Sequence, residues 1–212
     1  KRQTCGVVAV NAFSAADFRL RASGHVPAAD EYGDYILNPA FEREMKVAQY
    51  KDAAVLIGLR ERDGQSSVIL TERTAHLAKH AGQVAFPGGK IDPEDASPEA
   101  AALREAEEEI GLDPARVEVL GRLPDYLTGT GYRIKPVLAL VDPDARFVAN
   151  PHEVEAVFET PFPFLMDAAN FRRESRVWQG MERHYYTMQW DGHLIWGVTA
   201  GIIRMMRDRL YA

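Results

Sequence analysis

The feature that most constrains this chain is a turn rich in proline and glycine that leads directly into an acidic helix. It spans residues 86–112 and reads FPGGKIDPEDASPEAAALREAEEEIGL. Ser97 is a typical N-cap, Pro98 suits the first helical position, and Gly111 suits the position just past the last turn. These signals predict a helix over residues 98–110 that is preceded by a tight loop.

The predicted helix has one face that packs and another that gathers charge. At about 100° per residue, Leu103, Ala106 and Ile110 share one face. The other side carries three carboxylates, those of Glu105, Glu108 and Glu109. Such like charges destabilise a bare helix, and a divalent cation with oxygen ligands would relieve the repulsion. The stretch therefore indicates a divalent-metal site, the alternative being a solvated helix face with Arg104 in an ordinary surface pair.

Around this helix the chain resembles the Nudix hydrolases, whose signature is G-x5-E-x7-R-E-U-x-E-E-x-G-U, with U an aliphatic residue. The matching positions are Gly89, Arg104, Glu105, Glu108, Glu109, Gly111 and Leu112, with Ala106 as a small version of the first U. The chain departs from the pattern at Asp95, which stands in place of the first glutamate. Eight residues rather than seven separate it from Arg104, so the loop is longer by one residue and the role of Asp95 stays open.

The resemblance implies a Nudix fold, an α/β architecture in which a mixed β-sheet is sandwiched between α-helices. It also implies hydrolysis of a nucleoside diphosphate linked to another group, with Mg²⁺ or Mn²⁺ as cofactor. The implied metal ligands are Glu105 and Glu109, with Glu108 as a further ligand or base and the Gly89 carbonyl as another ligand. Arg104 would be the structural partner of this catalytic set.

The segment before the signature narrows the resemblance to the coenzyme A pyrophosphatase branch. That branch has a pattern near L-L-T-x-R-[SA]-x-x-L-R-x-H-x-G-x-x-x-F-P-G-G. The agreeing positions are Leu70, Thr71, Arg73, Leu77, His80, Gly82, Phe86, Pro87, Gly88 and Gly89. Thr74 is a mild change, whereas Ala78 stands where the branch has an arginine, so the substrate is less firmly indicated than the chemistry.

Positive side chains cluster in the same part of the sequence as the acidic helix. The candidates for binding substrate are Arg73, Lys79, His80 and Lys90. Their charge suits a substrate with several phosphates. A histidine at position 80 is equally consistent with a turn or packing role.

A late loop supplies the last candidate. The resemblance implies that a carboxylate from outside the helix completes the site as a metal ligand or as the group that deprotonates water. Glu153 fits the spacing of the branch to the following Val157-Phe158 pair and to Pro161. Glu155 occupies a position expected to vary, and the alternative is that both residues are rim charges.

The rest of the chain predicts one catalytic domain. Strands are expected at residues 53–59 and 67–71, joined at Asp63-Gly64, and at 117–123 and 132–141 around an exposed loop at 127–131. A hairpin across Asp191-Gly192 and an amphipathic helix over 200–210 follow. Tyr126 or Tyr132 could stack on a base, although half-burial against a sheet is the commoner role.

We predict a Nudix domain at residues 51–212 and an N-terminal extension at 1–50, with a helix starting after Ser14 and then a turn-rich linker. The net charge of −6 disfavours nucleic acid as a partner, and no apolar run is long enough for a membrane span. The single cysteine suits a reducing compartment, and we expect a cytoplasmic protein. Its expected partner is a small nucleotide substrate, and a homodimer stays open.

Three functions are consistent with the sequence. The first is a coenzyme A pyrophosphatase that yields phosphopantetheine and adenosine 3',5'-bisphosphate. The second is a Nudix pyrophosphatase for ADP-ribose or a dinucleotide, as the loss of arginine at Ala78 allows. The third is a non-catalytic regulatory module that binds a nucleotide, which the complete set of helix carboxylates disfavours.

Overall fold

A long hairpin lies at the centre of the computed structural model, which describes residues 11–24, 32–41, 49–75, 82–178 and 180–212. Its arms are β2 (Lys51–Arg62) and β3 (Gln65–Arg73), joined at Asp63-Gly64 as predicted. On its other edge β2 pairs in parallel with β8 (Tyr132–Val141) over ten residues. Because both edges and both faces of β2 are covered, its apolar residues form a nearly continuous run.

The main sheet has nine strands in the described part of the chain. The strands besides the hairpin and β8 are β1 (Tyr32–Gly33), β4 (Val84–Ala85), β5 (Gly88–Lys90), β6 (Val117–Arg122), β7 (Tyr126–Leu127) and β9 (Val154–Pro161). The order is β1-β7-β8-β2-β3-β4, with β5 paired to β2, β6 to β8 and β9 to β3. Parallel pairs (β2–β8, β1–β7) stand beside antiparallel ones, so the sheet is mixed, as predicted.

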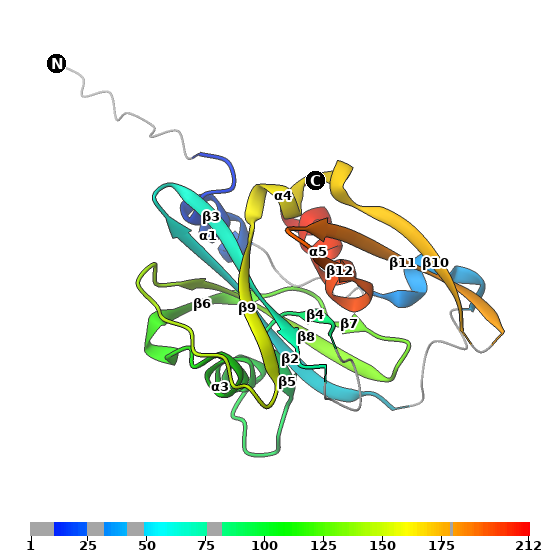
Figure 1. Cartoon of the computed structure of the whole chain (residues 1–212), viewed down its shortest axis with the longest axis horizontal. Helices are drawn as coiled ribbons and strands as arrows, with labels where there is room; N and C mark the ends of the chain where they lie inside the picture. Colours follow the sequence, from blue (N-terminus) through cyan, green and yellow to red (C-terminus); the bar gives the residue numbers. More distant parts are fainter. Residues whose placement is uncertain (1–10, 25–31, 42–48, 76–81, 179) are drawn as a thin grey trace.

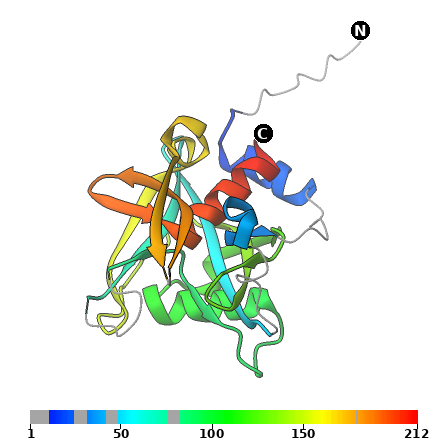
Figure 2. The ribbon, with the colours of Figure 1, turned by 90° about the vertical axis from the view of Figure 1, so that its right-hand side faces the viewer.

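Helices cover both faces of this sheet (Figures 1 and 2). Along β2, Ala54 and Leu56 pack with α3 (Pro98–Ile110), whereas Ile57 and Leu59 point to the opposite core. That second core contains residues of α1 (Ala15–Gly24), α4 (Phe162–Met166) and α5 (Gly197–Leu210). The alternation of side chains along a strand thus places α3 alone on one side of the sheet among these four helices.

A second, three-stranded sheet lies on the α5 side. It consists of β10 (Arg172–Trp178), β11 (Met181–Trp190) and β12 (His193–Trp196) in that order. The predicted turn at Asp191-Gly192 and the closing helix are confirmed, although α5 begins at Gly197. The sequence did not indicate β10, because all seven of its residues are exposed and show no apolar alternation.

The segment before the hairpin is more ordered than predicted. The helix after Ser14 is confirmed, and its Phe18 is fully buried in the main core. The predicted linker is wrong from Tyr32 onward, since β1 pairs with β7 and leads into the 3-10 helix η1 (Asp34–Leu37). The same contact explains why Thr128, predicted to be exposed, is only 2% exposed.

Short 3-10 helices complete the described elements: η2 (Pro39–Phe41), η3 (Pro114–Arg116) and η4 (Ala168–Asn170). None of the helices described here combines the length and the apolar character needed to cross a membrane.

Candidate active site

Helix α3 begins and ends at the residues that the sequence predicts. The Ser97 hydroxyl accepts a hydrogen bond from the Ala100 N–H at 3.2 Å, and Gly111 has a left-handed φ of 63°. Ala106 and Ile110 are fully buried in the core between α3 and the sheet, with Leu103 packed against it. The predicted packed face of α3 is therefore confirmed. Its packing fixes the direction in which the acidic face of the helix points.

The three glutamates predicted to hold the metal differ in burial, a difference that the sequence did not indicate. Glu108 is exposed, Glu105 is half-buried, and Glu109 is only 3% exposed. The Glu109 carboxylate accepts a hydrogen bond from the Gly88 N–H at 3.1 Å and pairs with Arg73 at 3.3 Å. Glu109 lies at the border of the packed face, and β5 and β3 close over it.

The two glycines of the loop let the backbone approach these carboxylates. Gly88 has a φ of 153°, and a Cβ there would lie 2.3 Å from the Ala54 carbonyl oxygen. A Cβ on Gly89 would lie 2.5 Å from the carboxylate of Glu105. Because Gly88 leaves no room for a Cβ and Gly89 lies directly against the Glu105 carboxylate, the loop forms a close cradle around two of the helix glutamates.

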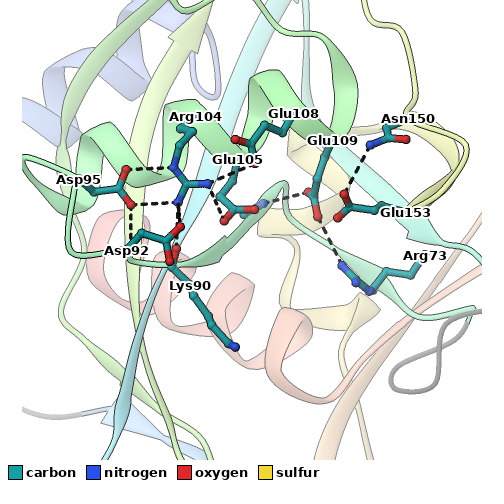
Figure 3. Close-up of polar contacts among 11 residues, drawn as sticks. Arg73, Lys90, Asp92, Asp95, Arg104, Glu105, Glu108, Glu109, Asn150 and Glu153 are labelled. Carbon is teal, nitrogen blue, oxygen red and sulfur yellow. Dashed lines mark hydrogen bonds and ion pairs between the residues drawn. The ribbon is translucent and has the colours of Figure 1, made fainter.

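Arg104 organises the other end of the cluster (Figure 3). Its guanidinium donates to both oxygens of Asp95, at 3.0 and 2.9 Å, and to Glu105 and Glu108 at 3.0 and 3.2 Å. A further bond at 3.1 Å goes to the backbone carbonyl of Lys90. Asp95, whose role the sequence left open, is thus the bidentate partner of Arg104 despite the longer loop.

Glu153 approaches the cluster from the loop before β9. Its backbone carbonyl accepts from the Thr74 N–H at 3.1 Å, and its carboxylate accepts from the Asn150 side chain at 3.4 Å. In Figure 3 the Glu153 carboxylate lies beside that of Glu109. Glu155 belongs to β9 and is exposed. The structure therefore brings Glu153 to the helix carboxylates and gives Glu155 no described contact with them.

The electrostatics of the cluster favour a cation. Burial raises the pKa of Glu109 to about 7, opposed by the Gly88 N–H and Arg73 and reinforced by Glu105 and Glu153. Burial also raises the pKa of Glu105, which Arg104 opposes. Carboxylates that are pulled out of water beside one another are stabilised when a positive ion binds between them.

The donor set fits a hard divalent cation, because all of its members are oxygen ligands. In the described part of the chain, no three acidic, histidine or cysteine side chains already have metal-binding geometry. The reason is local: Glu105 is turned to Arg104, and Glu109 to Gly88 and Arg73. Rotation of these side chains would redirect their oxygens toward a shared cation.

A pocket of about 380 Å³ adjoins the cluster and is lined by Arg73 and Gly88 at its polar edge. Its other walls come from η1, β7 and the following turn, β11 and the start of α5. Aromatic and aliphatic side chains such as Tyr185, Trp196 and Ile202 line much of the pocket, which is typical of a site for an organic ligand. Sequence reasoning missed this pocket, because its walls come from segments far apart in the chain that carry no local motif.

Of the predicted substrate-binding residues, the structure describes Arg73 and Lys90. Arg73 lines the pocket, whereas Lys79 and His80 lie outside the described residues. The Lys90 side chain is exposed and points away from the carboxylates in Figure 3. Both tyrosines line the pocket, and Tyr132 is half-buried. Tyr126 is only 3% exposed and donates to Asp34 at 2.7 Å, so it serves the core rather than stacking on a base.

Comparison with known proteins identifies the class to which this fold and site belong. The model of the NUDIX domain matches residues 49–184. An uncharacterized Nudix hydrolase, NudL, from Escherichia coli K12 is 43% identical over 169 residues, which cover 80% of this chain and 86% of NudL. The NudL of Shigella boydii serotype 4 shows the same identity and coverage.

Solved structures of Nudix proteins are also similar. RenU, a Nudix hydrolase from M. Smegmatis, is 24% identical with a TM-score of 0.47, covering 56% of this chain and 74% of its own. A C. elegans Ap4A hydrolase in a binary complex is 22% identical with a TM-score of 0.45, covering 53% and 81%.

The chain belongs to the NUDIX domain family. It is a Nudix hydrolase, an enzyme that acts on pyrophosphate bonds. Members of this family generally use divalent metal ions and bind small nucleotide substrates.

Proposed function

We propose that the protein hydrolyses the diphosphate of coenzyme A or its derivatives, giving phosphopantetheine and adenosine 3',5'-bisphosphate. The observation that carries the proposal is that the carboxylate cluster adjoins the pocket. Arg73 and Gly88 both line the pocket and both contact Glu109. A diphosphate at the cluster would have one organic arm in the pocket. The choice of coenzyme A rests on the resemblance of residues 69–89 to that branch.

In this proposal Glu105, Glu108 and Glu109 hold Mg²⁺ or Mn²⁺, with the Gly89 carbonyl as a further ligand. When bound, the ion neutralises charge on the phosphate oxygens and lowers the pKa of water. Arg104 keeps Glu105 and Glu108 in place through the bonds described above, and Asp95 fixes Arg104.

The chain's own acid–base group is Glu153. Its carboxylate takes a proton from water while the water oxygen bonds to one phosphorus. The bond from that phosphorus to the bridging oxygen breaks, and the leaving phosphate keeps the bridging oxygen. Arg73 stands beside Glu109, where its positive charge meets the diphosphate. Lys90, which is exposed at the end of β5, would bind only a phosphate that reaches that end. Lys79 and His80 stay predicted binding groups.

The test is a substrate panel of coenzyme A, 3'-dephospho-coenzyme A, ADP-ribose and a dinucleotide, assayed with Mg²⁺ and with Mn²⁺. We expect the highest kcat/KM for coenzyme A, with the two products identified by mass. A preference for ADP-ribose of about tenfold, or 1.4 kcal/mol in transition-state binding, would replace this proposal with the alternative substrate. Nucleotide binding without turnover would identify a regulatory module instead.

A further inference from the structure

The pocket has a second cationic side chain besides Arg73. It is Arg183, and it comes from the three-stranded sheet. Arg183 belongs to β11, which packs on the α5 side of the main sheet, whereas α3 packs on the opposite side. Arg73 and Arg183 both line the same pocket. The pocket therefore joins the diphosphate site to a positive group contributed by another part of the fold.

One buried donor atom of Arg183 has no hydrogen-bond partner among the described residues. Its Nε is buried, and no described residue accepts a hydrogen bond from it. Arginine stays protonated in proteins, so this N–H remains a donor, and a buried donor without a partner is costly. Such a group in a pocket indicates a ligand that completes it.

The nearest negative charge in the pocket is already engaged. Asp34 accepts a hydrogen bond from the Tyr126 hydroxyl at 2.7 Å and another from the Gly129 N–H at 2.8 Å. Arg183 acts on Asp34 through its electrostatic field, and no ion pair within 4.0 Å joins them in the described structure. Asp34 thus offsets part of the arginine charge without occupying its donors.

The walls beside Arg183 are aromatic. Tyr185 and Trp196 have their ring centroids 5.6 Å apart, and both line the pocket, as does Tyr32. Aromatic faces suit a nucleoside base, and an arginine fork suits a phosphate that it can bind through two N–H groups. Aromatic and cationic surfaces together indicate a phosphorylated nucleoside as the ligand of this end.

We propose that Arg183 binds a phosphate monoester on the nucleoside arm of the substrate, separate from the diphosphate that is cleaved. The inference rests on the proposed function and deepens it, because coenzyme A carries such a group as its 3'-phosphate. Arg183 would then select coenzyme A over substrates without a third phosphate, including ADP-ribose and dinucleotides. An acyl group with a carboxylate is the other source of an anion, and the test separates the two.

The test compares Arg183→Gln with Arg176→Gln as a matched control. Arg176 faces Arg183 across the β10–β11 pair but is exposed, so its substitution removes the same charge from the same hairpin outside the pocket. For Arg183→Gln we expect kcat/KM to fall on the order of tenfold or more with coenzyme A, mainly through KM, since a charged hydrogen bond is lost. With 3'-dephospho-coenzyme A we expect little change, and Arg176→Gln should resemble the wild type with both.

A binding measurement keeps this inference separate from the proposed function. Calorimetry without metal should show that adenosine 3',5'-bisphosphate binds more tightly than AMP, and that Arg183→Gln removes the difference. If coenzyme A is not cleaved while this binding pattern holds, the proposed function fails and the phosphate site stands. If Arg183→Gln does not fold, Arg183→Lys replaces it, with a partial loss expected because the charge stays and the fork is lost.

Three outcomes would overturn the assignment. Equal losses for both coenzyme A forms would place Arg183 at the diphosphate or in the fold. No loss with either form of coenzyme A would mean that Arg183 only packs its aliphatic part against the pocket wall. A loss confined to carboxylated acyl derivatives would move its ligand to the acyl arm.

Discussion

The carboxylate end and the β11 end of the pocket differ in how their charged side chains are hydrogen-bonded. At the carboxylate end, Arg104 donates to three side chains and a backbone carbonyl, and Glu109 accepts from Gly88 and Arg73. At the β11 end, the buried Nε of Arg183 has no acceptor among the described residues. The catalytic cluster is therefore held in place by the protein itself, whereas the far end is completed by what it binds.

The difference has a physical basis in what each end must do. A catalytic group gains from geometry that is fixed before the substrate arrives, because reorganisation during the reaction is costly. A selective site gains from a donor that only the right ligand can satisfy, because the wrong ligand leaves it unpaired. Substitutions at the first end should thus lower kcat, and those at the second should change KM and substrate choice.

The largest effect is expected from Glu109→Gln, which should remove most turnover at saturating Mg²⁺ while the fold is kept. Glutamine still accepts from the Gly88 N–H but removes the charge that a metal needs. The measurement is kcat together with a circular-dichroism spectrum. Activity like that of the wild type would remove Glu109 from the metal site.

The same variant has a pH signature in the absence of metal. The pKa of Glu109 is raised to about 7 in the folded state, above the usual value of 4.5. Its contribution to stability is therefore fully present below pH 4.5 and is lost as pH rises through 7, by up to roughly 3 kcal/mol. In EDTA, Tm of the wild type should fall relative to Glu109→Gln between pH 5 and 8. A constant difference would mean that Glu109 titrates normally.

Next in size is Glu153→Gln, expected to lower kcat about 10²- to 10⁴-fold with little change in KM, the usual range for a lost general base. Glu155→Gln is the matched control, two residues away in the chain but exposed and on β9. We expect it to be nearly silent. A reversed order would transfer the role to Glu155, and two mild effects would mean that water is activated without either.

The sequence predicted the carboxylate end well, because its information is local. The N-cap, the C-terminal glycine and the 3.6-residue period lie within residues 86–112, and Glu105, Glu108 and Glu109 follow from that register. The burial of Glu109 was not predictable, since it depends on β5 and β3 closing over the helix border. The approach of Glu153 was predicted from the resemblance alone, as residues two apart in a strand point the same way.

The β11 end could not be predicted in the same way. Its walls combine η1, the turn after β7, β11 and α5, and each segment reads as ordinary turn, strand or helix. The Asp34–Tyr126 bond spans 92 residues of sequence, and no period or spacing connects two such positions. Arg183 carried no functional signal in the sequence, and only the fold places it in a pocket.

A smaller effect is expected at the support of the catalytic cluster. Asp95→Asn should lower stability by about 1–2 kcal/mol and kcat by roughly tenfold, because one charge-assisted bond to Arg104 is lost and Glu105 loses alignment. Asp92→Asn is the control. Asp92 also pairs with Arg104, but at 3.6 Å with 56% of its side chain exposed, so its loss should cost less than about 0.5 kcal/mol. Equal effects of the two variants would contradict the special position of Asp95.

The smallest effect on turnover is expected from Tyr126→Phe, which tests the β11 end of the pocket without changing Arg183. The ring is buried, and its hydroxyl donates to Asp34 at 2.7 Å while lying against α5, where a Cβ on Gly201 would come within 2.2 Å. Removing the hydroxyl leaves Asp34 with the Gly129 N–H and should reduce the free energy of unfolding by about 1–2 kcal/mol, as measured in urea.

Because Tyr126 belongs to the selective end, kcat should stay near the wild-type value, and any change should appear in KM for coenzyme A as Asp34 loses its fixed position beside Arg183. Tyr132→Phe is the control: a half-buried tyrosine of the same pocket, for which we expect a stability change within about 0.5 kcal/mol. A fall in kcat for Tyr126→Phe at unchanged KM would show that the two ends of the pocket are coupled. The distinction between a catalytic end held in place by the protein and a selective end completed by its ligand would then be wrong.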